Sequence, residues 1–108
     1  DVEPARRLLV RLRDDLLPHE RADEERLVPI VARALGSGTT YALTRTHAEI
    51  EHQVSRVGRL LDDWPEGPPP AEDVVELRRL LYGLYGVLRL HNAQEEEIAF
   101  SLLPAHTH

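Results

Sequence analysis

Apolar residues recur at alternating steps of three and four positions along most of the chain, which is the periodicity of an amphipathic helix. The longest such stripe runs from Leu77 to Leu102. Two stretches rich in Gly and Pro interrupt the pattern, GSGTT at 36–40 and WPEGPPPAED at 64–73, and such clusters mark the ends of helices. The sequence therefore predicts an all-α fold, a bundle of three long helices in a single domain that spans residues 1–108.

At the first break we expect Gly36 to end one helix and Thr39 or Thr40 to begin the next, since glycine favours the position after a helix and threonine caps the start of one. The first helical segment contains Pro18 and Pro29. Each proline removes an amide donor and predicts a kink or a break nearby.

Polar residues replace leucines within each apolar stripe. In the third helix a histidine and a glutamate lie four residues apart, so both side chains project from one face into the core. The first helix repeats this spacing with an aspartate, and the middle helix has a histidine on its stripe and a glutamate one turn further on. In chain order these residues are His19, Asp23, His47, Glu51, His91 and Glu95. Burying a lone carboxylate is costly unless a cation or a hydrogen-bond network satisfies it, and a bound metal ion would remove that cost.

A single histidine on such a stripe is more often a satisfied core histidine than a metal ligand. Its recurrence in all three helices favours a metal site, because a purely structural core gains nothing from so many desolvated polar groups. The chain contains no cysteine, so disulfides and thiolate ligands are excluded. Histidine and carboxylate donors indicate iron or manganese, or less specifically zinc.

The composition is that of an ordinary folded domain, with 42% hydrophobic and 30% charged residues. A net charge of −6 without a basic cluster argues against nucleic acid as the main partner. No stretch approaches the roughly 18 consecutive apolar residues of a membrane span. We therefore expect a domain that is not itself embedded in a membrane, and a cytoplasmic location.

Three segments together resemble the hemerythrin-like, or HHE cation-binding, domains. They are LLPHERADEERLVP at 16–29, RTHAEIEHQ at 45–53 and LYGLYGVLRLHNAQEEEIAFSLL at 81–103. The resemblance implies a helical bundle that holds a non-haem diiron centre with an oxo or hydroxo bridge, although another divalent metal would fit the same donors. It also implies that the six polar residues named above are metal ligands, with histidines as terminal ligands and carboxylates as bridges.

In the first segment a second acid competes for the role of ligand. Glu24 has a longer side chain than Asp23 but lies about 100° off the stripe, so Asp23 is favoured and Glu24 stays open. The remaining acids beside the stripes are assigned to solvated helix faces: Glu20, Glu25, Glu96 and Glu97.

The chain departs from this family in its first helix. The family's domains have four helices, and the first normally contributes another histidine, whereas no histidine precedes His19. Either the chain begins after that helix, or this member lost it, or a second copy supplies the missing wall. Three long amphipathic helices leave one side of a four-helix core uncovered, so we expect a homodimer that buries this side.

The function that the resemblance implies is binding of dioxygen, or of another small diatomic or peroxide ligand, in an oxygen-sensing or iron-sensing role. Such a domain would regulate a larger protein, for example a P-type metal-transporting ATPase, and would be a binding domain rather than an enzyme. Two alternatives stay open. One is a diiron enzyme that reduces peroxide or nitric oxide, and the other is a metal-free helical module that docks on a partner.

Overall fold

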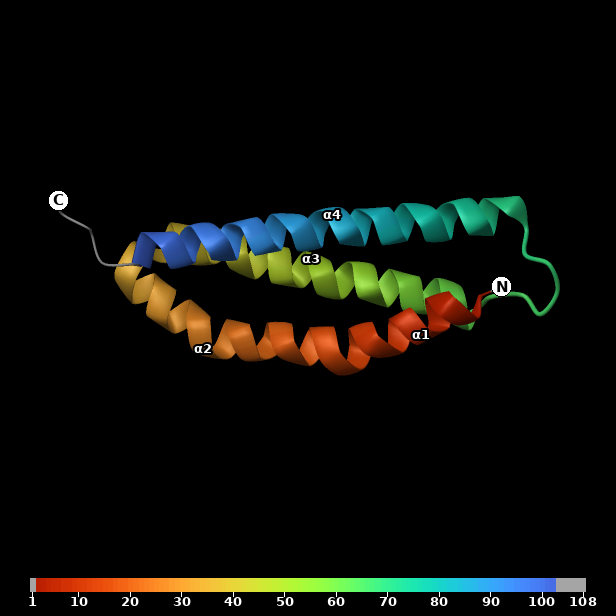
Figure 1. Ribbon diagram of the computed structural model, residues 1–108, viewed down its shortest axis with the longest axis horizontal. Coiled ribbons are helices and arrows are strands. Elements are labelled where there is room, and N and C mark those ends of the chain that lie inside the picture. Colours follow the sequence, from red (N-terminus) through yellow and green to blue (C-terminus); the bar gives the residue numbers. More distant parts are fainter. Residues whose placement is uncertain (1, 103–108) are drawn as a thin grey trace.

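A computed structural model describes residues 2–102 and is helical over nearly all of that range (Figure 1). Its elements are α1 (Glu3–Arg11), the π-helical turn η1 (Leu12–Leu16), α2 (Leu17–Leu35), α3 (Ser37–Asp62) and α4 (Ala71–Leu102). The first three follow one another without a break, so they form a single long rod. The described chain thus consists of three rods without any strand, which confirms the predicted all-α class.

The first turn is shorter than the sequence predicted. Gly36 alone separates α2 from α3, and its φ of 91° lies in the left-handed region that glycine adopts without strain. Because this one residue reverses the chain, α3 begins at Ser37, and the expectation that Thr39 or Thr40 starts the helix is wrong. Thr40 instead lies inside the first turn, where its Oγ1 donates a hydrogen bond to the Ser37 carbonyl at 2.8 Å.

The central rod is α3. α1 and α2 pack along one side of it, α4 packs along the other, and the three rods lie lengthwise beside one another (Figure 1). The apolar stripe of α3 is almost inaccessible to solvent and forms the middle of the core, with Leu43, Ile50, Val54, Val57 and Leu61. Each such side chain contributes about 1.5–3 kcal/mol when it leaves water, so this stripe holds the two outer rods in place.

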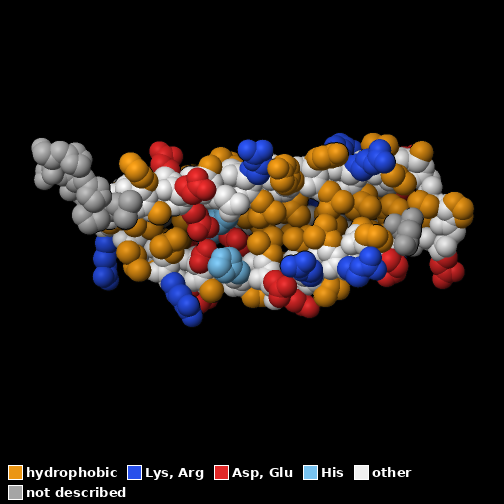
Figure 2. Space-filling view, viewed as in Figure 1, with side chains coloured by type: hydrophobic (Ala, Val, Ile, Leu, Met, Phe, Trp, Pro, Cys, Tyr) orange, Lys and Arg blue, Asp and Glu red, His pale blue; other side chains and the backbone are white. Residues whose placement is uncertain are grey.

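The face between α2 and α4 carries no fourth helix among the described residues. Seen from this face, hydrophobic side chains form a broad band between α1 and α4, and acidic and histidine side chains gather toward the α2 end (Figure 2). We call this surface the open face. In the described part of the chain, no helix is both long enough and apolar enough to traverse a lipid bilayer.

The π-helical turn ends two residues before Pro18. It closes with a hydrogen bond from the Leu17 amide to the Leu12 carbonyl, a separation of five residues instead of four. A proline ring crowds the carbonyl four residues earlier, which here belongs to Asp14. Pro18 therefore gives a physical reason for the wider turn, which accommodates one extra residue.

The extra residue changes which side of α2 faces the core. One additional position rotates the following helix by about 100°, so the buried stripe moves forward by one residue. Val31 is fully buried while Ile30 is 58% exposed, and Glu20 is buried while His19 is exposed. The part of the first predicted stripe that carries His19 and Asp23 is therefore wrong by one position.

Candidate metal centre

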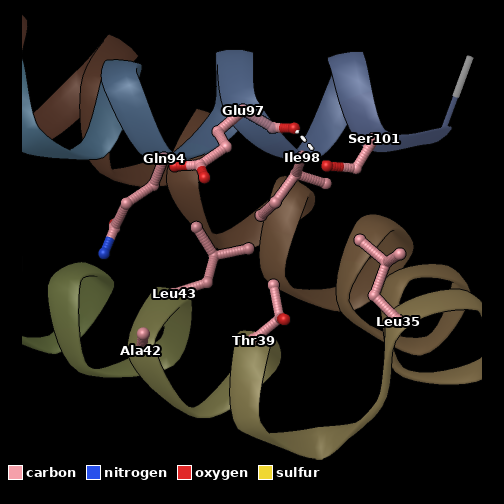
Figure 3. A pocket seen from close by; sticks show the side chains of 8 residues that line it. All are labelled: Leu35, Thr39, Ala42, Leu43, Gln94, Glu97, Ile98 and Ser101. Carbon is pink, nitrogen blue, oxygen red and sulfur yellow. Dashed lines mark hydrogen bonds between the residues drawn. The ribbon is translucent and has the colours of Figure 1, made fainter.

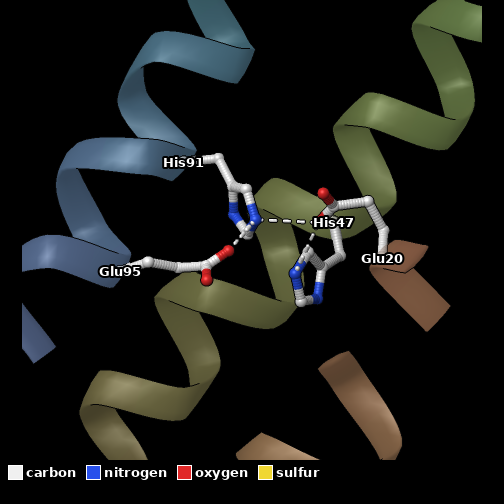
Figure 4. A group of neighbouring side chains, drawn as sticks. All are labelled: Glu20, His47, His91 and Glu95. Atoms are coloured by element: carbon white, nitrogen blue, oxygen red, sulfur yellow. Dashed lines mark ion pairs between the residues drawn. The ribbon is translucent and has the colours of Figure 1, made fainter. Parts of the chain in front are cut away.

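Four side chains from three helices converge at one point of the core (Figure 4). Glu20 comes from α2, His47 from α3, and His91 and Glu95 from α4. Each offers one ligand atom, and these atoms all lie within 4.8 Å of one another. We call this group the donor cluster.

Helical periodicity explains why three members of the donor cluster face the core. His47 lies on the buried stripe of α3, four residues after Leu43 and three before Ile50. His91 lies on the stripe of α4, seven residues after Leu84, and Glu95 follows it by one turn. The donor cluster therefore occupies positions that leucines or isoleucines hold elsewhere along the same rods.

Distances within the donor cluster are those of polar atoms in direct contact. Glu20 Oε2 lies 3.1 Å from His47 Nε2 and 2.8 Å from His91 Nε2. His91 Nε2 also contacts Glu95 Oε1, and the two imidazole rings are 4.6 Å apart at a tilt of 58°. All four side chains thus direct nitrogen or oxygen toward a common centre.

Although these atoms lie close together, most of them make no hydrogen bond within residues 2–102. They are Glu20 Oε2, His47 Nε2 and both ring nitrogens of His91, all buried. Buried polar atoms are normally satisfied, and leaving one unpaired costs about 1–3 kcal/mol. Two imidazoles and two carboxylates without sulfur suit iron, manganese or zinc, so these residues fit a metal ion.

Burial sets the electrostatics of Glu20. Glu20 is 4% exposed, and this loss of solvation raises the pKa of Glu20 above its ordinary value of 4.5. The nearby charges of His91 and His47 oppose this rise, whereas those of Glu95 and Asp23 add to it. A bound cation would favour the ionised carboxylate, because it supplies the opposite charge that the metal-free site lacks.

A carboxylate outside the donor cluster, that of Glu24, contacts the far edge of the His47 ring. The other ring nitrogen of His47, Nδ1, contacts Glu24 Oε2, and Thr44 Oγ1 donates a hydrogen bond to Glu24 Oε1 at 2.7 Å. Burial alone would raise the pKa of Glu24, but these two hydrogen bonds and the charge of His47 outweigh it and lower the pKa. Glu24 is therefore ionised at neutral pH and lies outside the donor cluster.

The structure brings together three of the six predicted site residues and separates the other three. His47, His91 and Glu95 belong to the donor cluster. His19 and Asp23 pair with each other at 3.5 Å, and the His19 side chain is 67% exposed. They are displaced because the π-helical turn rotates α2.

Glu51, the third residue outside the donor cluster, forms an ion pair with Arg21, with 2.9 Å between Nε and Oε1. It lies four residues after His47 on α3, but Ile50 and Val54 occupy the buried stripe there, so Glu51 is turned toward the edge. Glu51, predicted as a ligand one turn after His47, therefore lies outside the donor cluster.

Two residues of the site are not predicted by the sequence pattern. Glu20 is expected there on a solvated face, and Glu24 is ranked below Asp23. The sequence feature that could have predicted them is Pro18, because a proline inside a continuous helical pattern indicates a local change of register. Moving the stripe by one position after that proline puts both glutamates on the buried side.

One hollow adjoins the donor cluster, and another lies further along the same rods. The first, of about 200 Å³, opens between α2 and α3 and is lined by Glu20, Arg21, Glu24, Thr44, His47, Ala48 and Glu51. A larger one, of about 430 Å³, lies nearer the turn at Gly36 (Figure 3) and is lined by Leu35, Thr39, Ala42, Leu43, Gln94, Glu97, Ile98 and Ser101. Only the hollow between α2 and α3, which Glu20 and His47 line, gives a small molecule room directly beside the donor cluster.

Comparison with known protein families gives a match over nearly the whole chain. Residues 2–103 match the family model described as the hemerythrin HHE cation binding domain. No curated protein and no solved structure matches the chain.

Proposed function

Because the chain belongs to the hemerythrin HHE cation-binding family, we propose that the donor cluster binds iron and that the domain uses it to bind dioxygen or to sense oxygen or iron. The observation that carries this proposal is the convergence of four donor side chains from three helices, three of them buried and Glu95 partly buried. Without a cation, the donor atoms of the three buried residues have no hydrogen-bond partner among residues 2–102, which a purely structural core would not retain.

Iron is the metal that the donors and the family together favour. Two imidazole nitrogens and two carboxylate oxygens are the mixed donor set of non-haem iron sites. When bound, iron would supply reversible one-electron chemistry toward a small ligand. Glu20 would hold the metal together with His47 and His91, since its Oε2 already contacts both histidines.

A second iron would require further donors next to Glu20. His19 and Asp23 are the candidates, because they already pair on the same helix and the charge of Asp23 acts on Glu20. His19 is exposed on α2, so binding there would need its side chain to turn toward Glu20. In this proposal the donor cluster forms the first, buried metal site and the His19–Asp23 pair contributes to a more exposed second one.

The core around the donor cluster suits a binding role. Ile50, Leu84 and Ile98 are buried on either side of it, and an apolar surround limits water at a metal. The adjoining hollow of about 200 Å³, between α2 and α3, is large enough for a diatomic ligand. Metal binding and folding would be coupled, because the donors come from three separate rods and losing the metal would leave buried carboxylates uncompensated.

Metal content together with an optical spectrum tests the proposal. We expect iron to copurify with, or to reconstitute into, the protein, and the oxidised form to absorb in the near ultraviolet in a way that reduction removes. Restoring air after anaerobic reduction should reverse the change. His19→Ala should lower the stoichiometry from two metals toward one without abolishing binding. A protein that binds no iron after anaerobic reconstitution would refute the proposal, and steady turnover of peroxide with a reductant would point to an enzyme instead.

A further inference from the structure

We propose that Glu24 is a positioning residue that holds the imidazole of His47 with Nε2 directed into the donor cluster. This inference rests on the proposed metal-binding function. It concerns a contact outside the donor cluster, on the opposite edge of the His47 ring.

The contacts of Glu24 involve both of its carboxylate oxygens. Oε2 contacts His47 Nδ1, and Oε1 accepts the hydroxyl hydrogen bond of Thr44 at 2.7 Å. Thr44 precedes His47 by three residues on α3, so both partners project from neighbouring positions of the same helix. Glu24 is thus held at two points by α3, and its own helix, α2, also supplies Glu20 to the donor cluster.

A carboxylate at Nδ1 determines which nitrogen of a neutral imidazole carries the proton. An ionised carboxylate only accepts hydrogen bonds, so Nδ1 must donate and Nε2 is left with its lone pair free. Nε2 is the nitrogen that lies 3.1 Å from Glu20. The same carboxylate makes the imidazole a stronger donor to a metal and fixes the plane of the ring.

His91 provides an internal comparison. Its Nε2 also enters the donor cluster, but its Nδ1 is buried without a hydrogen-bond partner among the described residues. Among the described residues, therefore, no carboxylate contacts Nδ1 of His91 as Glu24 contacts Nδ1 of His47. The two histidines are held differently, and only His47 should respond when Glu24 is changed.

Two measurements on Glu24→Ala test the proposal. The first is the tautomer of each histidine in the metal-free protein, read from ¹⁵N chemical shifts of the ring nitrogens. The second is affinity for Co²⁺, measured by competition with a chromophoric chelator. The matched control is Glu25→Ala, which removes the same charge from the next, exposed residue of α2, and Thr44→Val removes the second anchor of Glu24 with little change in shape.

In the parent protein we expect His47 to carry its proton on Nδ1. Glu24→Ala should shift His47 toward a mixture of tautomers, leave His91 unchanged and weaken Co²⁺ binding about 10- to 100-fold, the usual effect of losing a partner behind a ligand. Thr44→Val should change the His47 tautomer and the Co²⁺ affinity in the same direction but by less, and Glu25→Ala should change neither.

An unchanged His47 tautomer in Glu24→Ala would overturn the proposal, even if Co²⁺ affinity fell, because Glu24 would then act as a ligand or as a general support. Equal Co²⁺ affinities for Glu24→Ala and Glu25→Ala would overturn it too. If the parent protein binds neither Co²⁺ nor iron, the proposed function fails, and the tautomer of His47 still decides whether Glu24 positions the ring.

Discussion

Replacing Glu20 by leucine should stabilise the metal-free protein and abolish metal binding. Glu20 is 4% exposed, and its Oε2 has no hydrogen-bond partner in the described part of the chain. Leucine has a similar volume and restores the apolar stripe that continues from Leu16 and Leu17, both packed against the core. Substituting buried charged groups with packed hydrophobic residues is neutral or stabilising by about 1–4 kcal/mol, so we expect the free energy of unfolding to rise by about 1–3 kcal/mol at pH 7.

The pH dependence follows from the raised pKa of Glu20. Between the ordinary value of 4.5 and the raised value, the folded protein holds a proton that the unfolded chain has released. The contribution of this group to the free energy of unfolding therefore falls as pH rises through that window. Glu20→Leu lacks this decline, so the stability difference between the variant and the parent should be smallest near pH 4 and largest at neutral pH.

Metal should reverse the order of stability. A ligand that binds only the folded state at about 1,000 times its dissociation constant adds about 4.1 kcal/mol, which exceeds the expected gain from leucine. The parent protein should then be the more stable of the two, while Glu20→Leu should not respond to metal. Urea denaturation followed by circular dichroism measures the free energy of unfolding of both proteins, first with Co²⁺ and then with a chelator as the metal-free baseline.

The control is Glu25→Leu, which changes an exposed residue on the same helix and should alter the metal-free stability by no more than about 0.5 kcal/mol. If Glu20→Leu is less stable than the parent protein without metal, Glu20 is part of a stabilising network rather than a carboxylate kept for a cation. Retention of full Co²⁺ affinity by Glu20→Leu would refute its role as a ligand.

Three further outcomes are expected. Glu95→Leu should lose metal, while Glu96→Leu and Glu97→Leu should retain it, because the side chains of Glu96 and Glu97 are exposed and turned away from the donor cluster. Metal analysis after gel filtration measures this, and full metal content in Glu95→Leu would contradict the prediction. Acid should release the metal cooperatively as pH falls below about 6, where protons compete for histidine, and a metal content independent of pH down to about 4 would count against histidine ligation. We also propose that a second copy of the chain covers the open face, because a hydrophobic band of this breadth is unusual on a monomer; light scattering that gives a monomer at every micromolar concentration would exclude the dimer.

Periodicity in the sequence is enough to determine the helical class, the number of rods and most of the core. The stripe of α3 and the part of the α4 stripe from Leu84 to Ile98 are predicted correctly, because nothing interrupts the regular hydrogen bonding of those helices around His47 and His91. At the two ends of α4 the prediction is less accurate, since Leu80 is buried and Leu102 is 38% exposed. A helix with 3.6 residues per turn places such positions on one face wherever its geometry is undisturbed. For the same reason the spacing alone predicts that Glu95, one turn after His91, lies on the inner face.

Tertiary structure decides which residues of α2 join the donor cluster. The sequence offers a donor in either register, His19 with Asp23 or Glu20 with Glu24, and the two sets differ by one position. A single extra residue in the π-helical turn before Pro18 rotates the helix by about 100°, which buries Glu20 and leaves His19 exposed. Hydrophobic periodicity cannot locate such a turn, because Leu16 and Leu17 satisfy both registers. Pro18 indicates that the register can change there, but packing against α3 selects which one forms.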